Sequence, residues 1–281
     1  MRKIQTKIIT KAAELLCNEA NFKLPNDVLE HLKQNFIFES NNIAKGILSD
    51  IIENANIALN DKIPLCQDTG SANFFLEIGK EVYIEGRDSI YEAINRGTAL
   101  GYTKNYLRKS IVLDPIIRKN SNDNTPANIY ISITSGDKIK ITFLAKGGGS
   151  DNASVLKMFN PTSSWQEIED FIVDSIKNKG KNSCPPLIIG IGIGGSFSNV
   201  SFLSLKALLR NIGSSNKNKF YDEKEKELLN TINNLNIGPM NLGGKTTSLA
   251  VFIETKPTHI ASLPVAVNFQ CHSYRKRTII I

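Results

Sequence analysis

The chain has 281 residues, of which 41% are hydrophobic and 22% charged, a composition typical of globular proteins that excludes a fibre or a disordered chain. Its 34 lysines and arginines outnumber its 27 aspartates and glutamates, so the formal net charge is +7. These charges are spread along the chain, so we expect solvated faces that attract anions rather than a nucleic-acid site. No apolar run reaches the roughly 20 residues that span a bilayer, and the first residues lack the continuous apolar stretch of a secretory signal.

The first sixty residues are predicted to be helical. A first helix is indicated by apolar residues that recur every three to four positions, namely Ile4, Ile8, Ala12 and Leu15. A second helix is expected after a cap at Asn26-Asp27, and a third after a cap at Ser40. The third helix carries one apolar stripe, namely Ile43, Ile47, Ile51 and Ala55.

Strands and helices then alternate. Strands are predicted over 72–78, 128–134, 138–144, 187–191 and 248–254, with a last strand ending at Cys271, and helices over 88–107, 165–178 and 199–210. The turn Ser135-Gly136-Asp137 predicts that the strands on either side of it form a hairpin. Hairpin-linked and crossover-linked strands together predict a mixed α/β fold. We expect one domain over 1–281, with a helical layer over about 1–60 packed on a mixed α/β part over about 61–281.

The four cysteines, Cys17, Cys66, Cys184 and Cys271, lie far apart in the sequence. A chain of this length needs no disulfide scaffold, and reduced cysteines in the cytoplasm are expected. The close cysteine pairs of structural zinc sites are absent. Cys66 and Cys184 stand beside prolines in loops, so three thiolates could hold three irons of a [4Fe–4S] cluster and leave the fourth iron open as a Lewis acid. The residues alone leave this hypothesis open beside a purely structural role.

Two loops combine glycine with reactive side chains. PLCQDTG, residues 64–70, puts a thiol, an amide, a carboxylate and a hydroxyl within four positions, and it can be a reactive site or a polar turn. KGGGSDN, residues 146–152, follows a predicted strand and precedes a helix start. Backbone N–H groups at a helix start suit an anion such as a carboxylate, so we favour an anion site there.

Two other glycine loops imitate nucleotide-binding motifs. Gly190, Gly192 and Gly195 satisfy GxGxxG, but the acidic residue expected about 20 positions later at a strand end is missing. GGKTT, residues 243–247, resembles the end of a P-loop, but the required first glycine is one position out of place. Both nucleotide readings are therefore disfavoured.

Several long motifs, taken together, resemble the class I fumarate hydratase family. The motifs are PLCQDTGSANFFLEIG, LRKSIVLDP, AKGGGSDNASVLKMFNP, CPPLIIGIGIGGSFSNVSFLSLKALLR and NIGPMNLGGKTTSLAVFIETKPTHIASLPVAVNFQC. They are more similar still to the α-subunits of the two-subunit members, which include L-tartrate dehydratases. The likeness runs from about residue 10 to 275 and implies a fold like the family's N-terminal domain.

The resemblance implies a cofactor and a set of site residues. It implies a [4Fe–4S] cluster held by Cys66, Cys184 and Cys271, with one iron that has no cysteine ligand. Substrate-binding roles are implied for Gln67, Arg108, Lys146 and Gly148. Catalytic roles are implied for Asp68, as proton donor or relay, and for His259, which would tune it.

The resemblance also implies a function and partners. The expected reaction is the reversible hydration of fumarate to (S)-malate in the tricarboxylic acid cycle, with L(+)-tartrate dehydration as the alternative. A non-catalytic iron–sulfur protein is an alternative of another class, and so is a dinucleotide-dependent oxidoreductase. The domain that supplies further arginines and the base in single-chain relatives is not in this sequence, which implies a separate β-subunit and an α2β2-type oligomer that binds neither nucleic acid nor membrane.

Overall fold

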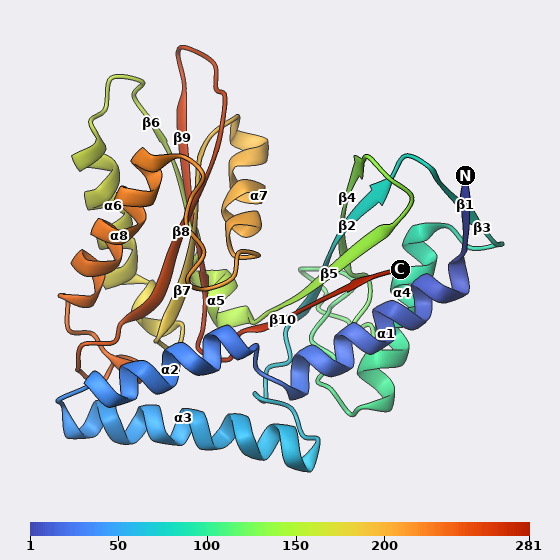
Figure 1. The fold of residues 1–281 in the computed structure, drawn as a ribbon, viewed down its shortest axis with the longest axis horizontal. Helices are drawn as coiled ribbons and strands as arrows, with labels where there is room; N and C mark the ends of the chain where they lie inside the picture. Colours follow the sequence, from blue (N-terminus) through green and yellow to red (C-terminus); the bar gives the residue numbers. More distant parts are fainter. The chain divides into compact units, whose positions relative to one another are not determined.

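The computed structural model describes residues 1–281 as two compact units (Figure 1). Unit 1 comprises Met1–Pro25, Ala55–Gly148 and Arg275–Ile281, and unit 2 comprises Asn26–Asn54 and Gly149–Tyr274. Each unit is therefore built from separate stretches of the chain. The mixed α/β fold class is confirmed, while the single domain over 1–281 stays a prediction.

Unit 1 is a mixed four-stranded sheet covered by two helices. Its elements are β1 (Arg2–Gln5), α1 (Thr6–Phe22), β2 (Ser71–Gly79), β3 (Val82–Glu85), α4 (Ile90–Lys104), β4 (Asn128–Thr134), β5 (Ile139–Lys146) and β10 (Arg275–Ile280). The strand order is β10-β5-β2-β4, in which β2 runs antiparallel to β5 and parallel to β4. The core lies between this sheet and α1 and α4, where Leu16, Phe74 and Phe143 are fully or almost fully buried.

The predicted hairpin is wrong, although both of its strands exist. β4 and β5 do not pair, because β2 lies between them. β2 is buried along most of its length, so a central place lets it bury both faces and pair both edges. The turn after β4 wraps the end of β2, where the Gly79 N–H donates to the Lys138 carbonyl oxygen at 2.9 Å. A Cβ at Gly79 would lie 2.3 Å from the carbonyl oxygen of Gly136, so only glycine fits there.

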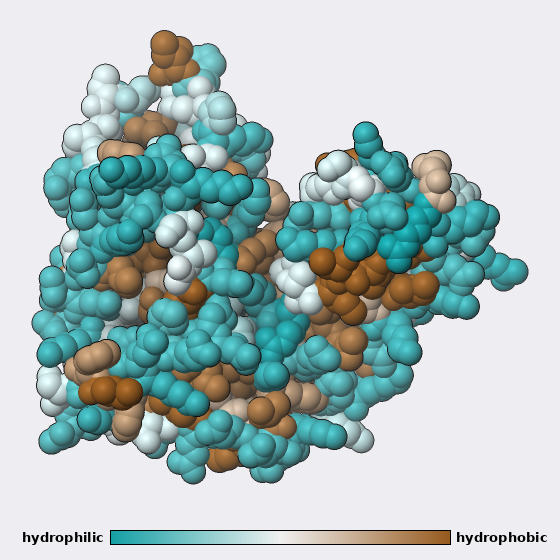
Figure 2. Space-filling view, viewed as in Figure 1, coloured by the Kyte–Doolittle hydropathy of each residue, from teal (hydrophilic) through white to brown (hydrophobic).

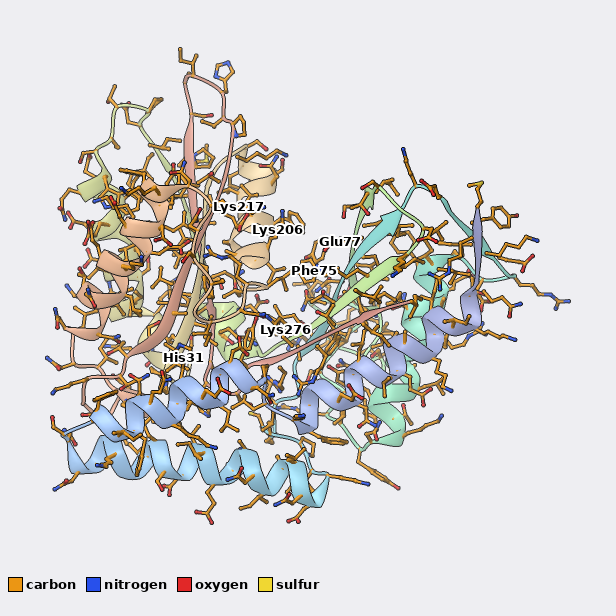
Figure 3. The ribbon with its side chains drawn as sticks, viewed as in Figure 1. His31, Phe75, Glu77, Lys206, Lys217 and Lys276 are labelled. Atoms are coloured by element: carbon orange, nitrogen blue, oxygen red, sulfur yellow. The ribbon has the colours of Figure 1, made fainter.

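Two side chains of β2 contact the residues directly opposite them on the neighbouring strands. Phe75 stacks on Tyr130 of β4 with ring centroids 5.0 Å apart, and Glu77 accepts a hydrogen bond from Lys140 of β5 at 2.9 Å (Figure 3). These directly opposed pairs stabilise the sheet and fix its register.

Unit 2 is a second mixed sheet with helices on both faces. Its elements are α2 (Asn26–Phe38), β6 (Val155–Phe159), α6 (Trp165–Asn178), β7 (Leu187–Gly194), α7 (Phe197–Ala207), α8 (Lys219–Asn233), β8 (Ser248–Lys256) and β9 (Leu263–Gln270), with short 3-10 turns at Gly180–Asn182 and Pro239–Asn241. The strand order is β6-β9-β7-β8. Helices α6 and α8 cover one face and α7 covers the other (Figure 1). Two further helices, α3 (Asn42–Asp61) and α5 (Gly148–Ala153), contain residues of both units.

The GxGxxG glycines belong to packing rather than to a phosphate loop. Gly190 and Gly192 lie inside β7, not after it. A Cβ on Gly190 would lie 2.2 Å from the carbonyl oxygen of Ser204, and one on Gly192 would lie 2.4 Å from that of Val200. The missing side chains therefore let α7 approach the sheet closely.

The predicted N-terminal helices are confirmed, with local corrections. Ile4 lies in β1 rather than in a helix, and β1 pairs with β3. Asn41, not Ser40, caps α3, because its side-chain oxygen accepts the N–H groups of Ile43 at 2.9 Å and Ala44 at 3.2 Å. The sequence also missed β3, β6 and β10, and β10 follows the strand expected to be the last.

The surface of unit 1 has an apolar groove. Figure 2 shows hydrophobic side chains gathered where α1 and β10 run in Figure 1. The groove there measures about 490 Å³ and is lined by Lys7, Ile8, Lys11, Ala12, Leu15, Ile279 and Ile281. No helix of the chain combines the length and the apolarity that a membrane crossing requires.

Candidate active site

The Cys66–Gly70 turn is held from its buried side through its carbonyl groups. The hydroxyl of Tyr102 donates to the carbonyl oxygens of Thr69 at 3.1 Å and Gly70 at 3.2 Å. Arg275 donates to the carbonyl oxygen of Asp68, and the amide of Asn124 donates to that of Gly70 at 3.1 Å. These donors are fully or almost fully buried, so the turn has a fixed shape.

Asp68 joins this turn to the glycine-rich loop. One carboxylate oxygen accepts the Gly70 N–H at 3.0 Å, and the other accepts the Gly148 N–H at 2.8 Å. Gly148 begins α5, so the anion predicted at this helix start is, in this structure, a carboxylate of the chain itself. The structure thus brings together two of the predicted site residues, and it orients the Asp68 carboxylate through both of its oxygens.

Gln67 and Arg108 form a second contact beside the same turn. The Arg108 guanidinium donates to Gln67 Oε1 at 3.3 Å, and the Thr69 hydroxyl donates to the Arg108 carbonyl oxygen at 3.2 Å. The Arg108 side chain is exposed, so its remaining N–H groups face solvent. The structure therefore brings together two of the three side chains predicted to bind substrate, with Arg108 donors available for a carboxylate.

Lys146 ends β5 and is buried. Its carbonyl oxygen would lie 2.6 Å from a Cβ at Gly70, whose φ is +74°. This close approach requires glycine in the turn. A substrate-binding role for Lys146 stays a prediction.

In unit 2, Cys184 and Cys271 stand on adjoining loops. Cys184 is exposed and has a φ of +54°, and Cys271 is half-buried directly after β9. The ring nitrogen Nδ1 of His272 lies 3.0 Å from the Cys184 carbonyl oxygen, and the His272 N–H donates to the same oxygen. The structure thus brings these two cysteine loops together at one end of the sheet.

His259 lies at the opposite end of that sheet. It belongs to the loop between β8 and β9, and Cys271 follows the far end of β9. β9 has 8 residues. A strand of that length spans about 26 Å. The His259 ring accepts the Ala261 N–H on Nδ1 at 3.1 Å, so the neutral ring carries its proton on Nε2.

Three of the four cysteines are accessible to an incoming metal group, and one is not. No group of three His, Cys, Asp or Glu side chains is close enough to hold one ion. In an iron–sulfur cluster each iron takes its own ligand, so cysteines far apart in the sequence can hold one cluster. Cys66, Cys184 and Cys271 are all at least partly accessible, so an incoming cluster can reach each thiol. Cys17 is fully buried, and burial raises the pKa of its thiol far above the usual range, which disfavours a thiolate there.

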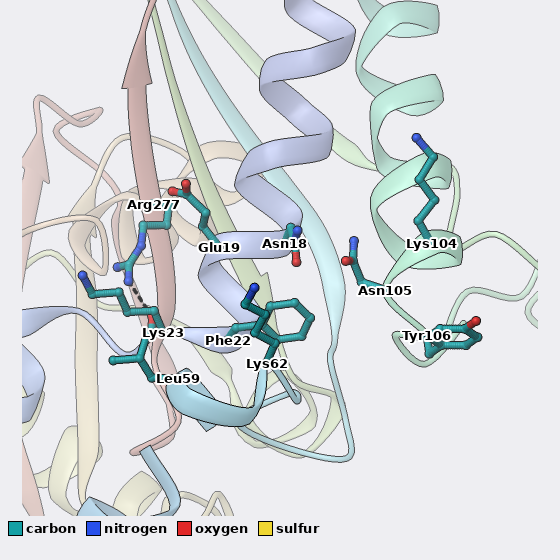
Figure 4. A pocket seen from close by; sticks show the side chains of 10 residues that line it. All are labelled: Asn18, Glu19, Phe22, Lys23, Leu59, Lys62, Lys104, Asn105, Tyr106 and Arg277. Carbon is teal, nitrogen blue, oxygen red and sulfur yellow. Dashed lines mark hydrogen bonds between the residues drawn. The ribbon is translucent and has the colours of Figure 1, made fainter. Parts of the chain in front are cut away.

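A separate pocket of about 620 Å³ in unit 1 contains none of the predicted site residues (Figure 4). It is lined by Asn18, Glu19, Phe22, Lys23, Leu59, Lys62, Lys104, Asn105, Tyr106 and Arg277. Four of these side chains are cationic and one is anionic. The pocket is therefore a basic hollow apart from the Cys66–Gly70 turn.

Sequence reasoning missed the residues that support the site from behind. Tyr102 lies within a predicted helix, Asn124 within a polar loop and Arg275 in a strand that the sequence did not indicate. Arg275 is only 1% exposed, and its Nε has no hydrogen-bond partner. Arginine is rarely buried so deeply without a specific partner, so the burial of Arg275 marks it as a supporting residue. The sequence alone does not reveal that burial.

Comparisons with known proteins agree with these motifs. The sequence model of the fumarate hydratase (Fumerase) family matches residues 10–280. A protein of Methanocaldococcus jannaschii with the provisional name L(+)-tartrate dehydratase subunit alpha is 41% identical, over 93% of this chain and 93% of its own length. The L(+)-tartrate dehydratase subunit alpha of Escherichia coli O157:H7 is 29% identical, over 97% of this chain and 91% of its own length.

Proposed function

The chain belongs to the fumarate hydratase (Fumerase) family, and from this premise we propose that it is the α-subunit of a two-subunit hydro-lyase that dehydrates a 2-hydroxydicarboxylate. The observation that carries the proposal is the match over residues 10–280, which includes all three accessible cysteines. Both relatives are named as alpha subunits, which supports a separate β-subunit. A cytoplasmic location and an α2β2 assembly remain predictions.

L(+)-tartrate is the substrate we favour. The sequence motifs alone put fumarate hydration first and tartrate dehydration second. The names of the relatives favour the second, because both refer to L(+)-tartrate dehydratase. L(+)-tartrate and (S)-malate differ by one hydroxyl group. Both present the two carboxylates that a basic site would bind. The pair (S)-malate and fumarate is therefore the second candidate.

The cysteines Cys66, Cys184 and Cys271 would hold a [4Fe–4S] cluster, and this group, when bound, supplies a Lewis acid that makes hydroxide a better leaving group. The chain's own residues bind and orient the substrate. Arg108 offers a planar fork of donors to one carboxylate, and its contact with Gln67 aligns the Gln67 amide beside it. The Gln67 amide is a further polar group beside Arg108, whereas the Gly148 N–H already donates to Asp68, and its substrate role stays a prediction.

Asp68 is the group that moves a proton. Its two oxygens already accept backbone N–H groups, so the carboxylate cannot rotate freely. A proton held on Asp68 would therefore have a defined direction, as proton transfer to a leaving oxygen requires. The base that removes the carbon-bound proton is expected from the β-subunit.

His259 would act across a subunit boundary. Within one chain it lies the length of β9 from Cys271, which is too far to contact a substrate bound beside Cys184 and Cys271. We infer that in an α2β2 oligomer the exposed loop between β8 and β9 serves the site of the other α-subunit instead.

Reconstitution with a β-subunit tests the function. We expect the anaerobically loaded α-subunit to be inactive alone and to turn over L(+)-tartrate once the β-subunit is added, because substrate-binding groups and the base come from that partner. The release of a 2-oxo acid measures tartrate dehydration, and ultraviolet absorbance of fumarate measures malate dehydration. Full turnover by the α-subunit alone would contradict the proposal, and a larger kcat/KM for malate would make fumarate hydratase the activity.

Two tyrosine-to-phenylalanine changes separate positioning from stability. Tyr102→Phe and Tyr274→Phe each remove one buried phenol hydroxyl that donates to a backbone carbonyl, but only Tyr102 contacts the Cys66–Gly70 turn. We expect each change to lower the free energy of unfolding by about 1–2 kcal/mol. Only Tyr102→Phe should also lower kcat/KM, by about tenfold, because it loosens the turn that carries Gln67 and Asp68. Equal activities of the two variants would contradict a positioning role for Tyr102.

A further inference from the structure

An exposed apolar tip lies on the loop that follows Arg108. Leu113 is 62% exposed, Ile116 is 85% exposed and Ile117 is 79% exposed. Single exposed apolar residues are normal, but three large aliphatic side chains within five positions of one turn indicate a contact surface. We call these three residues the aliphatic tip.

The aliphatic tip is held in one conformation by its own hydrogen bonds. Val112 and Asn120 form an antiparallel bridge, and the Leu113 N–H donates to the Lys119 carbonyl oxygen at 2.8 Å. Asp114 Oδ1 accepts the N–H groups of Ile116 at 2.8 Å and Ile117 at 2.6 Å. A partner that binds this turn therefore does not have to order it first, which favours tight association.

The loop that carries the tip is anchored to the candidate active site at both sides of its stem. Its first residues include Arg108, which contacts Gln67. After the tip, Asn120 donates to the Lys109 carbonyl oxygen at 2.8 Å, and Asn124 contacts both the Ser110 N–H and the Gly70 carbonyl oxygen. A protein that covers the tip would therefore contact the same loop that presents Arg108 to substrate.

The charges around the tip define its partner. Residues 106–120 contain four cations, Arg108, Lys109, Arg118 and Lys119, and one anion, Asp114. A second copy of this loop would bring like charges together in a two-fold interface, which is unfavourable. An apolar hollow with an acidic rim complements both the aliphatic side chains and the flanking cations.

We propose that the aliphatic tip is the docking point of the β-subunit, which receives Leu113, Ile116 and Ile117 in an apolar hollow bordered by acidic residues. The inference rests on the proposed function and adds the place at which the partner binds. It also explains how the partner's residues reach the substrate, since the docked loop begins at Arg108. A lipid surface would also accept an apolar tip flanked by cations, but it would lie against the loop that must admit a water-soluble dicarboxylate.

The test is the affinity of the α-subunit for the β-subunit. The double variant Ile116→Asp/Ile117→Asp should raise the Kd at least about a hundredfold, because two buried aliphatic side chains are lost and two anions face an acidic rim. The matched control is Ile37→Asp/Ile43→Asp. It makes the same substitutions on helices α2 and α3, at residues that are 67% and 64% exposed, and should leave the Kd unchanged. Asp114→Ala keeps the aliphatic side chains but loosens the turn, so it should raise the Kd only about fivefold.

The outcomes distinguish this inference from the proposed function. If the unmodified chain binds no β-subunit, the two-subunit function fails and this inference with it. If the unmodified chain and the Ile116→Asp/Ile117→Asp variant bind equally well, only the docking point is wrong. Two further outcomes would overturn the proposal. If the unmodified chain alone binds anionic vesicles and the Ile116→Asp/Ile117→Asp variant does not, the tip binds a membrane. If the unmodified chain associates with itself and this variant does not, the tip binds a second copy.

Discussion

Replacing Cys184 by serine is expected to abolish the cluster and the activity together. A serine hydroxyl is a poor substitute for a thiolate, so the iron content should fall from about four atoms per chain to a small fraction of that value. The hydro-lyase rate should fall at least about a thousandfold, since the Lewis acid is lost. Cys66→Ser and Cys271→Ser should give the same result. Iron analysis and visible absorbance of anaerobically loaded protein, followed by the dehydratase assay with the β-subunit, measure both effects.

Cys17→Ala is the matched control for this series. Cys17 is fully buried where α1 crosses α4, and a Cβ at Gly101 would lie 2.8 Å from its own Cβ. Its replacement should reduce stability by about 1 kcal/mol and leave the iron content unchanged. Loss of the cluster in Cys17→Ala but not in Cys184→Ser would overturn the assignment of the ligands.

Two inactive α-subunits are expected to restore activity when they assemble together. His259→Ala keeps the three cysteines but lacks the histidine, and Cys184→Ser keeps the histidine but lacks a ligand. If His259 serves the neighbouring site, a mixed dimer contains one intact site. Random mixing makes about half of the dimers mixed, so about a quarter of the unmodified activity should return.

Complementation is measured by coexpressing the two α-chains with the β-subunit and comparing the purified mixture with each variant alone. The control is the double variant His259→Ala/Cys184→Ser coexpressed with unmodified chain. If His259 serves the neighbouring site, these mixed dimers contain no intact site and should be inactive. If the mixture of single variants is as inactive as its components while the individual variants still assemble, then His259 acts within its own chain or not at all.

The sequence predicted the helices well, because their signals are local. Trp165–Asn178 has the predicted bounds, and its capping box at Ser164 and Glu167 is a sequence-level signature. Strand pairing was harder. The turn at 135–137 has the residues of an ordinary hairpin turn. Only the sheet order shows that β2 lies between β4 and β5, so that these two strands do not pair. β10 was missed because its charged residues alternate poorly, although Arg275 and Lys276 are buried.

The site shows the same division between local and distant information. The motif CQDTG indicated a turn, and the structure brings Asp68 to Gly148 and Gln67 to Arg108, while the catalytic and substrate roles of these residues stay predictions. Tyr102, Asn124 and Arg275 lie 32 to 207 positions away from the residues they hold, and nothing in their neighbouring sequence distinguishes them. The family resemblance predicts the residues that would contact substrate, whereas the buried donors behind them are identified only by the fold.

The alternation of the chain between its two units has a consequence for synthesis. The last strand of the unit 1 sheet comes from Arg275–Ile280, after all of Gly149–Tyr274 has been made. The ribosome therefore releases the Cys66–Gly70 turn long before it releases Arg275, the side chain that supports the Asp68 carbonyl group. The turn therefore reaches its final form only after all of unit 2 and Arg275 have been synthesised. If Cys66 is a cluster ligand, its loop is completed only when Arg275 is available, so a product that stops before Arg275 would lack a fully supported Cys66–Gly70 turn.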